Sequence, residues 1–260
     1  MSVSTRDSRV GWPGAAAELR NEPKKVEVQM SLPQVASREQ WLSARRQLLA
    51  KEEELTSRRD ALNSDRRRLP MVRIEKDYLF EGARGQIGLA ELFDGCRQLI
   101  IHHFMFDPSW DAGCPTCSAA SDELSGGLLA RLRARDTAFA AISLAPFAKI
   151  TAYRAWNGWT FPWYSSFGSD FNYDFHVTLD ENVAPVVYNY QPKAEILAND
   201  VANDVANDLI DAEQPVEVPG ISCFLRNGDS IYHTYSAYAH GVEQLSCARS
   251  FLELTVLGNR

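Results

Sequence analysis

Residues 98–117, QLIIHHFMFDPSWDAGCPTC, decide the fold of this chain. The run from Gln98 to Phe106 is almost continuously apolar and stops at Asp107-Pro108, which is typical of a central strand covered on both faces. A short loop then leads to Cys114-Pro115-Thr116-Cys117. Proline suits the first position of a helix, where its missing N–H is not needed. The stretch therefore predicts a buried strand followed by a CxxC motif that opens a helix.

The two cysteines of this motif are the strongest candidates for chemistry. At the cap of a helix, Cys114 would face unpaired N–H groups and the positive end of the helix dipole, which favours the thiolate. Cys117 would lie one turn further along, close enough to form a disulfide with Cys114. We expect Cys114 to attack a disulfide and Cys117 to resolve the mixed disulfide. A four-thiolate zinc site is excluded because the chain has no second CxxC.

The rest of the chain alternates strands with helices, which favours a parallel sheet of the α/β class. A strand-like run follows the insertion at 198–209, and Asn227-Gly228 is a strong signal for a two-residue hairpin. We therefore predict a mixed sheet with helices on both faces. The expected elements are helical spacing at 115–135, a buried strand at 138–145, a helix at 147–156, hairpin strands at 216–225 and 230–235, and a closing helix at 241–252.

Two segments precede this domain, which we place at 71–260. Residues 1–35 are polar and form an N-terminal arm, and residues 36–70 hold a long amphipathic helix, about 38–68. Ser37 and Gln40 have the spacing of a capping box. The helix carries an apolar residue every seven positions, which is compatible with a homodimer seam or with a helix lying across its own domain. The stripe consists of Trp41, Leu48, Leu55, Leu62 and Leu69.

Two further stretches stand out by composition. Residues 159–175 contain eight aromatic side chains, and they form either a binding surface or a loop packed down by its own rings. Residues 198–209 repeat a four-residue unit, Ala-Asn-Asp-Val or Ala-Asn-Asp-Leu, three times. We interpret this repeat as a surface insertion without chemistry.

The composition of the chain argues against membrane proteins and nucleic-acid-binding proteins. The chain has 260 residues, of which 45% are hydrophobic and 23% charged, as in soluble globular proteins. It has no apolar run long enough for a transmembrane helix and no visible secretory signal, so we expect a cytoplasmic protein without a membrane partner. The formal net charge of −7 argues against nucleic acid as a partner.

Several motifs together resemble one known family. The chain over about 36–260 is similar to the thioredoxin-like proteins labelled as a domain of unknown function, DUF899, and often described as candidate dithiol-disulfide oxidoreductases. The matching pieces are residues 103–106 (HFMF), 113–118 (GCPTCS), 158–166 (GWTFPWYSS), 171–176 (FNYDFH), 224–228 (FLRNG) and 233–235 (HTY).

The resemblance implies a thioredoxin-like mixed sheet flanked by helices, with a long N-terminal helix and an insertion before the final hairpin. It implies that Pro219 is a cis-proline packed against the active cysteines and shapes a substrate groove. We expect Trp110, Trp163 and Tyr164 to wall that groove. A peroxiredoxin would carry a threonine three residues before its reactive cysteine, and Asp111 stands there instead.

The function predicted from the sequence is thiol-disulfide exchange through Cys114 and Cys117 on a small-molecule or protein disulfide, without a required cofactor. The alternative is a Cu(I) or zinc site in which the two thiols are joined by His103, His176 or His233, because thiolates and imidazoles suit these metals. His176 and His233 are expected on strands, and His102 and His103 on opposite faces of theirs. A third class is a scaffold without catalysis that dimerises through the long helix.

Overall fold

The computed structural model describes residues 33–198 and 214–238. Predictions for nearly all of the N-terminal arm, for the Ala-Asn-Asp repeat after residue 198 and for the closing helix at 241–252 lie outside the described residues. Within the described ranges, no helix is both long enough and apolar enough to cross a bilayer.

One eight-stranded mixed sheet organises the domain, in the order β1-β12-β11-β4-β5-β6-β2-β3. The strands β4, β5 and β6 run parallel at its centre, and the strands on both sides of them pair antiparallel. This confirms the predicted fold class. The strands of the sheet are β1 (Val72–Arg73), β2 (Leu79–Gly82), β3 (Gly85–Gly88), β4 (Gln98–His103), β5 (Thr137–Ser143), β6 (Trp163–Ser165), β11 (Gly220–Asn227) and β12 (Ser230–Tyr238).

The parallel strands are joined by helical crossovers that pack on one face of the sheet. Consecutive right-handed crossovers in the same direction bring their helices to the same side. The region predicted helical at 115–135 divides into two helices, because Ser125 caps a new one by accepting a hydrogen bond from the Leu128 N–H. The crossover helices are α2 (Pro115–Asp122) and α3 (Gly126–Arg133) between β4 and β5, and α4 (Phe147–Asn157) between β5 and β6.

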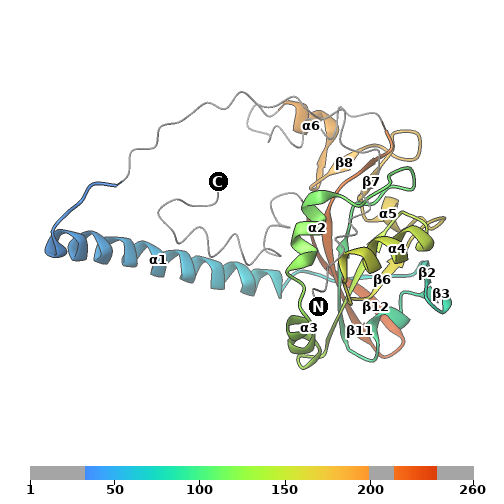
Figure 1. Cartoon of the computed structure of the whole chain (residues 1–260), viewed down its shortest axis with the longest axis horizontal. Helices are drawn as coiled ribbons and strands as arrows, with labels where there is room; N and C mark the ends of the chain where they lie inside the picture. The colour runs from blue at the N-terminus through green and yellow to red at the C-terminus, as the bar shows by residue number, and fades with distance from the viewer. Residues whose placement is uncertain (1–32, 199–213, 239–260) are drawn as a thin grey trace, which may run out of the picture.

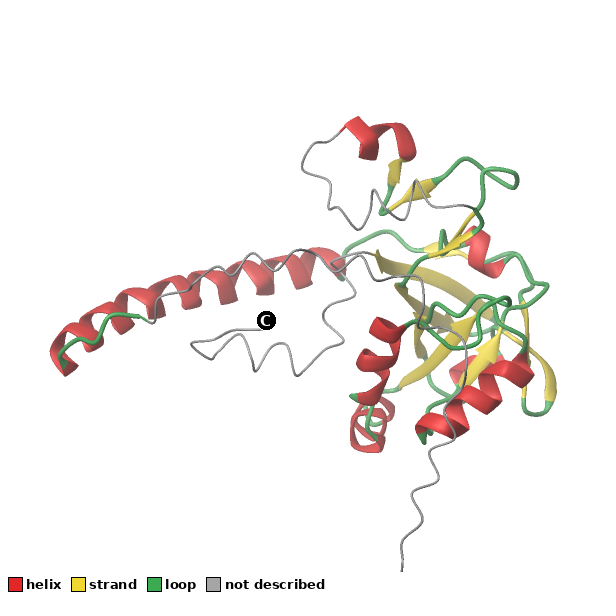
Figure 2. Ribbon diagram, turned by 45° about the horizontal axis from the view of Figure 1, so that its top comes forward, coloured by secondary structure: helices red, strands yellow, loops and turns green. Residues whose placement is uncertain are grey.

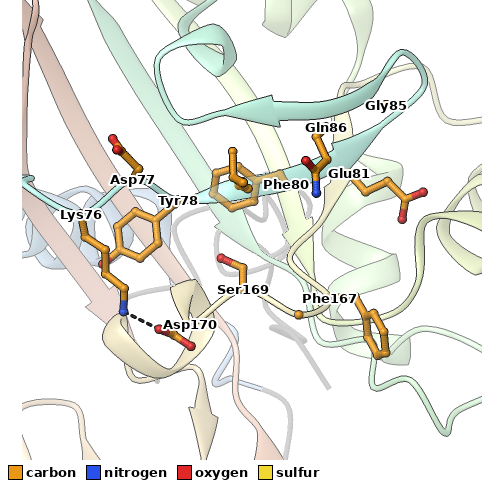
Figure 3. A pocket seen from close by; sticks show the side chains of 12 residues that line it. Lys76, Asp77, Tyr78, Phe80, Glu81, Gly85, Gln86, Phe167, Ser169 and Asp170 are labelled. Carbon is orange, nitrogen blue, oxygen red and sulfur yellow. Dashed lines mark ion pairs between the residues drawn. The ribbon is translucent and has the colours of Figure 1, made fainter.

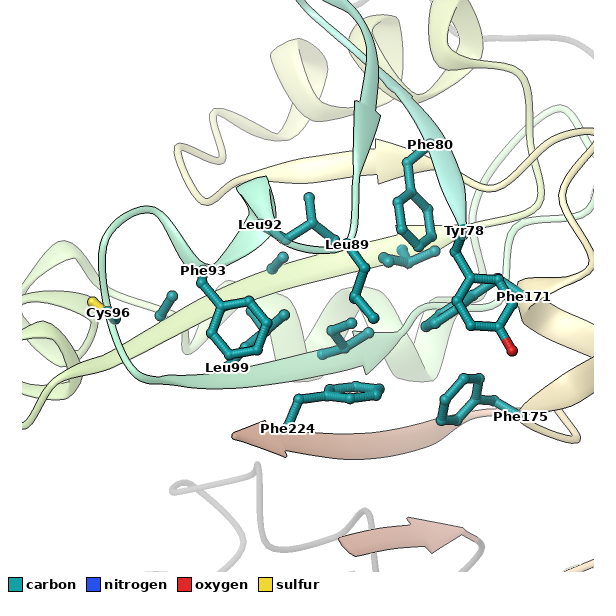
Figure 4. Close-up of a cluster of buried hydrophobic side chains, with 14 residues drawn as sticks. Tyr78, Phe80, Leu89, Leu92, Phe93, Cys96, Leu99, Phe171, Phe175 and Phe224 are labelled. Carbon is teal, nitrogen blue, oxygen red and sulfur yellow. The ribbon is translucent and has the colours of Figure 1, made fainter. Parts of the chain in front are cut away.

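Side chains that alternate along β4 and β5 separate two hydrophobic cores. On β5, Ala138, Ala140 and Ile142 enter one core, whereas Phe139 and Ala141 enter the other. The first core holds Phe80, Phe93, Phe171, Phe175 and Phe224 (Figure 4) and includes the short helix η1 (Glu91–Phe93). The second core lies under α2, α3 and α4 and includes both cysteines of the CxxC motif. The thiols therefore belong to the helical face of the sheet.

Smaller elements extend the domain beyond the main sheet. Two short antiparallel ribbons enclose a third cluster of buried side chains that includes Val177, Leu179 and Tyr238. These elements are α5 (Phe171–Asp174), β7 (Thr178–Leu179), β8 (Val187–Tyr188), β9 (Gln191–Pro192), α6 (Lys193–Ala198) and β10 (Val216–Glu217).

The N-terminal helix α1 (Arg38–Arg66) extends away from the sheet domain (Figures 1 and 2). It begins with the predicted capping box: the Gln40 N–H donates to the Ser37 hydroxyl, and the Gln40 side chain accepts from the Ser37 N–H. No residue of the helix is buried. The interpretation as a helix lying across its own domain is therefore wrong for the described residues.

The final hairpin forms as predicted, but the cis-proline does not. β11 and β12 pair up to Asn227 and Ser230, and Gly228 adopts a left-handed backbone with φ 60°. The described residues hold one cis peptide bond, Gln214–Pro215, so the peptide before Pro219 is not cis as the resemblance implied. Three intervening residues, which include a short strand at Val216–Glu217, separate Pro215 from Pro219.

The aromatic segment at 159–175 is packed down by its own rings. Phe161, Trp163, Phe171 and Phe175 are buried and divide between the two cores. Phe167 is an exception, with 59% of its surface exposed. The segment thus fills the domain, and most of its rings are not available to a ligand.

Two buried histidines on β4 predict a pH dependence of stability. Burial lowers the pKa of His102 to about 4 and that of His103 to about 3. Between pH 4 and 6.5 the unfolded chain binds protons at these residues and the folded chain does not, so the free energy of unfolding falls as the pH falls. Above pH 6.5 this contribution is complete.

We expect His102→Leu to reduce this slope by about one proton per molecule, measured by urea unfolding at a series of pH values. An unchanged slope would show that His102 is protonated in the folded protein.

Candidate dithiol site

The backbone of Met105 holds the CxxC motif against the end of β4. Its carbonyl accepts a hydrogen bond of 3.0 Å from the Cys114 N–H, and its N–H donates to the Cys117 sulfur. The backbone at the end of β4 therefore fixes both cysteines directly, although nine residues separate Phe104 from Cys114 in the sequence.

Cys114 occupies the N-cap of α2, as the sequence predicted, with Pro115 at the start of the helix. Its sulfur accepts hydrogen bonds from the Cys117 side chain and from the backbone N–H groups of Thr116 and Cys117. These donors outweigh burial and lower the pKa of Cys114 to about 6. Because a thiolate is the nucleophile in disulfide exchange, this sulfur is prepared to attack near neutral pH.

Cys117 has the opposite electrostatic situation. It donates its S–H to Cys114 and is buried beside that charge, and both effects raise its pKa well above the usual value. Cys117 is also less accessible to solvent than Cys114, with 3% of the residue exposed against 9%. The two thiols, both free in this structure, are thus divided into an outer thiolate and an inner protonated partner.

Gly113 allows the motif to lie close to two aromatic rings. A Cβ at this position would be 2.5 Å from Cε1 of Phe104 and 3.0 Å from Cε1 of Tyr153. The Tyr153 hydroxyl also forms a 3.0 Å hydrogen bond with the Ser118 hydroxyl, which donates to the Cys114 carbonyl. Tyr153 therefore supports the first turn of α2 from outside the motif.

One face of α4 forms a side wall of this site. Lys149, Tyr153 and Trp156 are spaced i, i+4 and i+7 and so share a helix face. The Lys149 ammonium donates to the carbonyls of Pro108 and Trp110, which fixes the loop before Cys114. Trp156 packs on Tyr153 with ring centroids 5.9 Å apart and keeps 71% of its surface exposed.

Sequence reasoning missed this wall. The helical spacing of the three residues was visible, but nothing in the sequence showed which helix would pack beside the thiols.

The three aromatic residues predicted to wall one groove lie in three different places in the structure. Trp110 is partly exposed, at 38%, in the loop before Cys114. Trp163 is buried in the core below the thiols, where its indole N–H donates to Ser143. Tyr164, the next residue on β6, packs on the opposite face of the sheet. Trp163 and Tyr164 therefore do not line one groove, because neighbouring residues of a strand point to opposite sides.

Pro219 lies one residue before β11, whose first residue, Gly220, is opposite His103 of β4. It is partly exposed and stands at the end of β4 from which the chain continues to the CxxC loop. This placement is compatible with a role beside the thiols, which stays a prediction.

The three histidines predicted as metal ligands do not gather around the thiols. His103 stacks on Phe171 and Phe175, on the face opposite the cysteines. His233 is on a strand, as predicted, but it belongs to a hydrogen-bond network that also contains His103. Hydrogen bonds of 2.7 Å each connect these residues in the order His103, Ser222, Ser236 and His233.

His176 is not on a strand: it is exposed in a turn and has a positive φ of 53°. Among the residues that the structure describes, no three His, Cys, Asp or Glu side chains are grouped as a metal site. The ligand set predicted for copper or zinc, with histidines beside the two cysteines, is therefore not assembled here.

A pocket of about 480 Å³ lies elsewhere, between β2 and the segment 167–170 (Figure 3). Lys76 forms an ion pair with Asp170 at one end, and Phe167 lines the other side. None of its lining residues belongs to the core around the cysteines. The chemistry predicted for the thiols does not use this pocket.

Comparisons with known proteins identify the family. Residues 30–260 match the model of a family described as "Bacterial protein of unknown function (DUF899)". Because the match covers most of the chain, this protein belongs to the DUF899 family. No curated protein matches it.

Solved structures share the general arrangement at low similarity. A Xanthomonas campestris bacterioferritin comigratory protein, described for alkyl peroxide reduction, is 11% identical, with a TM-score of 0.40 over 64% of this chain and 84% of that one. A candidate thiol:disulfide interchange protein, DsbE, from Chlorobium tepidum is 12% identical, with a TM-score of 0.33 over 68% of this chain and 95% of that one. At these scores the likeness carries no argument about function.

The close approach at Gly113 predicts the cost of adding one methyl group. Gly113→Ala would displace Phe104 or Tyr153, and we expect it to lower the free energy of unfolding by about 1–3 kcal/mol in urea denaturation. Gly127→Ala is the matched control, because a Cβ there meets only the Ser125 hydroxyl at 3.8 Å. Equal stability of the two variants would show that the rings do not press on the motif.

Proposed function

We propose that this protein is a thiol-disulfide oxidoreductase that acts through Cys114 and Cys117. The observation that carries the proposal is the Cys114 sulfur at the N-cap of α2, where backbone N–H groups and the Cys117 thiol favour its ionised form. A buried structural cysteine would show the reverse, as Cys223 does: burial raises the pKa of Cys223 to about 11.

The reaction follows from the different states of the two thiols. The Cys114 thiolate attacks one sulfur of a substrate disulfide, forms a mixed disulfide and releases the other substrate sulfur as a thiolate. Cys117 then loses its proton and attacks the Cys114 sulfur, which releases the second substrate thiolate. The protein ends with a Cys114–Cys117 disulfide, and two electrons have passed to the substrate. A further thiol reductant must reduce that disulfide before the next turnover.

The exposed aromatic wall on α4 supports a substrate with apolar or aromatic groups beside its disulfide. Tyr153 touches the position next to Cys114, and Trp156 extends the surface outward from Tyr153. Tryptophan and tyrosine offer large rigid contact area to a peptide. In this proposal, the wall on α4 lines the substrate groove in place of Trp163 and Tyr164. Trp110, in the loop before Cys114, adds to the same groove.

Alkylation of the reduced protein tests the proposal. We expect Cys114 to react fastest with iodoacetamide, with a half-maximal rate at a pH well below 9, because its pKa is lowered. Cys117, Cys96 and Cys223 serve as internal controls in the same peptide mass map. Equal or slower reaction at Cys114 would contradict the proposed nucleophile.

Activity of the cysteine variants completes this test. Cys114→Ser should abolish reduction of a peptide disulfide, whereas Cys117→Ser should retain the attack and accumulate the mixed disulfide. An alkyl peroxide serves as a second substrate, because a thiolate of lowered pKa can also be oxidised by a peroxide. Turnover of the peroxide without turnover of disulfides would make the protein a peroxidase, and copper or zinc bound through Cys114 and Cys117 would make it a metal protein.

Trp156 should affect recognition without affecting the thiol chemistry. We expect Trp156→Ala to lower kcat/KM for a peptide disulfide flanked by aromatic residues by about tenfold, equivalent to about 1.4 kcal/mol. Reduction of hydroxyethyl disulfide, which has no aromatic group, should be unchanged. Phe167→Ala, at another exposed aromatic residue away from the thiols, is the control. A parallel loss with both substrates, or no loss with either, would remove Trp156 from the substrate surface.

A further inference from the structure

The helix α1 exposes an apolar stripe along its length. Its members keep between 42% of their surface exposed, at Leu42, and 67%, at Leu55. A helix of 29 residues is about 43 Å long, and its far end is distant from the sheet domain (Figure 1). The exposed members of the stripe are Trp41, Leu42, Leu48, Leu49, Leu55 and Leu62.

The described part of the sheet domain does not cover this stripe. Helices in water gain most of their stability from packing of an apolar face, and isolated helices are marginal even at good lengths. At the C-terminal end of the helix, the Arg66 guanidinium lies over the Tyr235 ring of the sheet, 5.3 Å from its centroid. Within the described residues, the apolar stripe is therefore open to a partner surface.

Charged residues occupy the positions between the leucines of the stripe. Arg45, Glu52 and Arg59 follow one another at seven-residue intervals, four residues after Trp41, Leu48 and Leu55. Arg45 and Glu52 form an ion pair of 2.8 Å along the helix, so these side chains lie in one line beside the leucines. The stripe thus alternates apolar and charged positions.

We propose that the partner of this stripe is α1 of a second copy, packed antiparallel. In a parallel pair in register, each charged position would face itself, Arg45 against Arg45 and Glu52 against Glu52, and like charges at a helix seam are unfavourable. In an antiparallel pair centred between residues 55 and 56, Glu52 of each copy meets Arg59 of the other. The Arg59 stem then covers a leucine while its guanidinium group meets Glu52. The same register places Arg45 opposite Arg66 near the ends of the pair, so two of the four charged positions are complementary, against none in the parallel pair.

The antiparallel arrangement also determines where the two domains lie. Each sheet domain continues from the C-terminal end of its own helix, so the two domains occupy opposite ends of the helix pair. The pairing surface is separate from the dithiol site, whose residues are on β4, α2 and α4. The association is therefore independent of the proposed chemistry.

The oligomeric state of the full chain is the first test. We expect sedimentation equilibrium to give a dimer for the wild-type protein and a monomer for Leu55→Asp, with circular dichroism confirming that the sheet domain remains folded. A wild-type protein that stays monomeric at concentrations up to about 100 μM would overturn the proposal. A Leu55→Asp variant that stays dimeric would overturn it as well.

Charge reversal tests the direction of pairing. We expect Glu52→Arg and Arg59→Glu each to weaken association at least tenfold, because both create like-charge contacts across the antiparallel pair, and the double variant to recover it. In a parallel pair each single reversal only exchanges one like-charge contact for another and changes little. Glu54→Arg, on the opposite side of the helix from the stripe, is the matched control for net charge. Single reversals without effect, or a double variant that fails to recover, would contradict the antiparallel pair.

Discussion

The site depends on one backbone segment, the peptide groups of Met105 that hold the CxxC turn against the end of β4. The Met105 carbonyl binds the N–H of Cys114, and the Met105 N–H binds the sulfur of Cys117. Because β4 is a central strand, paired with β5 on one side and β11 on the other, this support is rigid. The first turn of α2 is thereby held in place, with its N–H groups directed at the Cys114 sulfur.

Two neighbouring thiols can do different work because their surroundings separate their pKa values. Backbone donors and the Cys117 S–H stabilise the Cys114 thiolate, and the same thiolate, together with burial, keeps the proton on Cys117. The aromatic groups around them exclude water from the inner thiol, while Trp156 and Trp110 leave an exposed surface beside the outer one. Under the proposed function, this arrangement places the nucleophile and the resolving group in the second core and the substrate surface beside it.

Local signals predicted the fold well, and long-range placement was predicted poorly. The apolar run 98–106, Pro115 after Cys114, and Asn227-Gly228 each specify their own element, and each element formed. Trp163 and Tyr164 were assigned to one groove because aromatic residues gather there in the sequence, but strand alternation sends them to opposite cores. Tyr153 and Lys149 were missed because their importance comes from the packing of α4, which no local pattern reveals. The cis-proline was misplaced because it was taken from the resemblance alone.

The central claim is that the Cys114 thiol is ionised near neutral pH while its neighbour Cys117 keeps its proton. Ultraviolet absorbance of thiolates, followed through a pH titration of the reduced wild-type protein and of Cys114→Ser and Cys117→Ser, measures this directly. The account predicts one thiol that titrates far below the rest, that disappears in Cys114→Ser, and whose pKa rises in Cys117→Ser because the S–H donor is gone. A wild-type protein in which every thiol titrates at or above the ordinary value of 9.0 would contradict it.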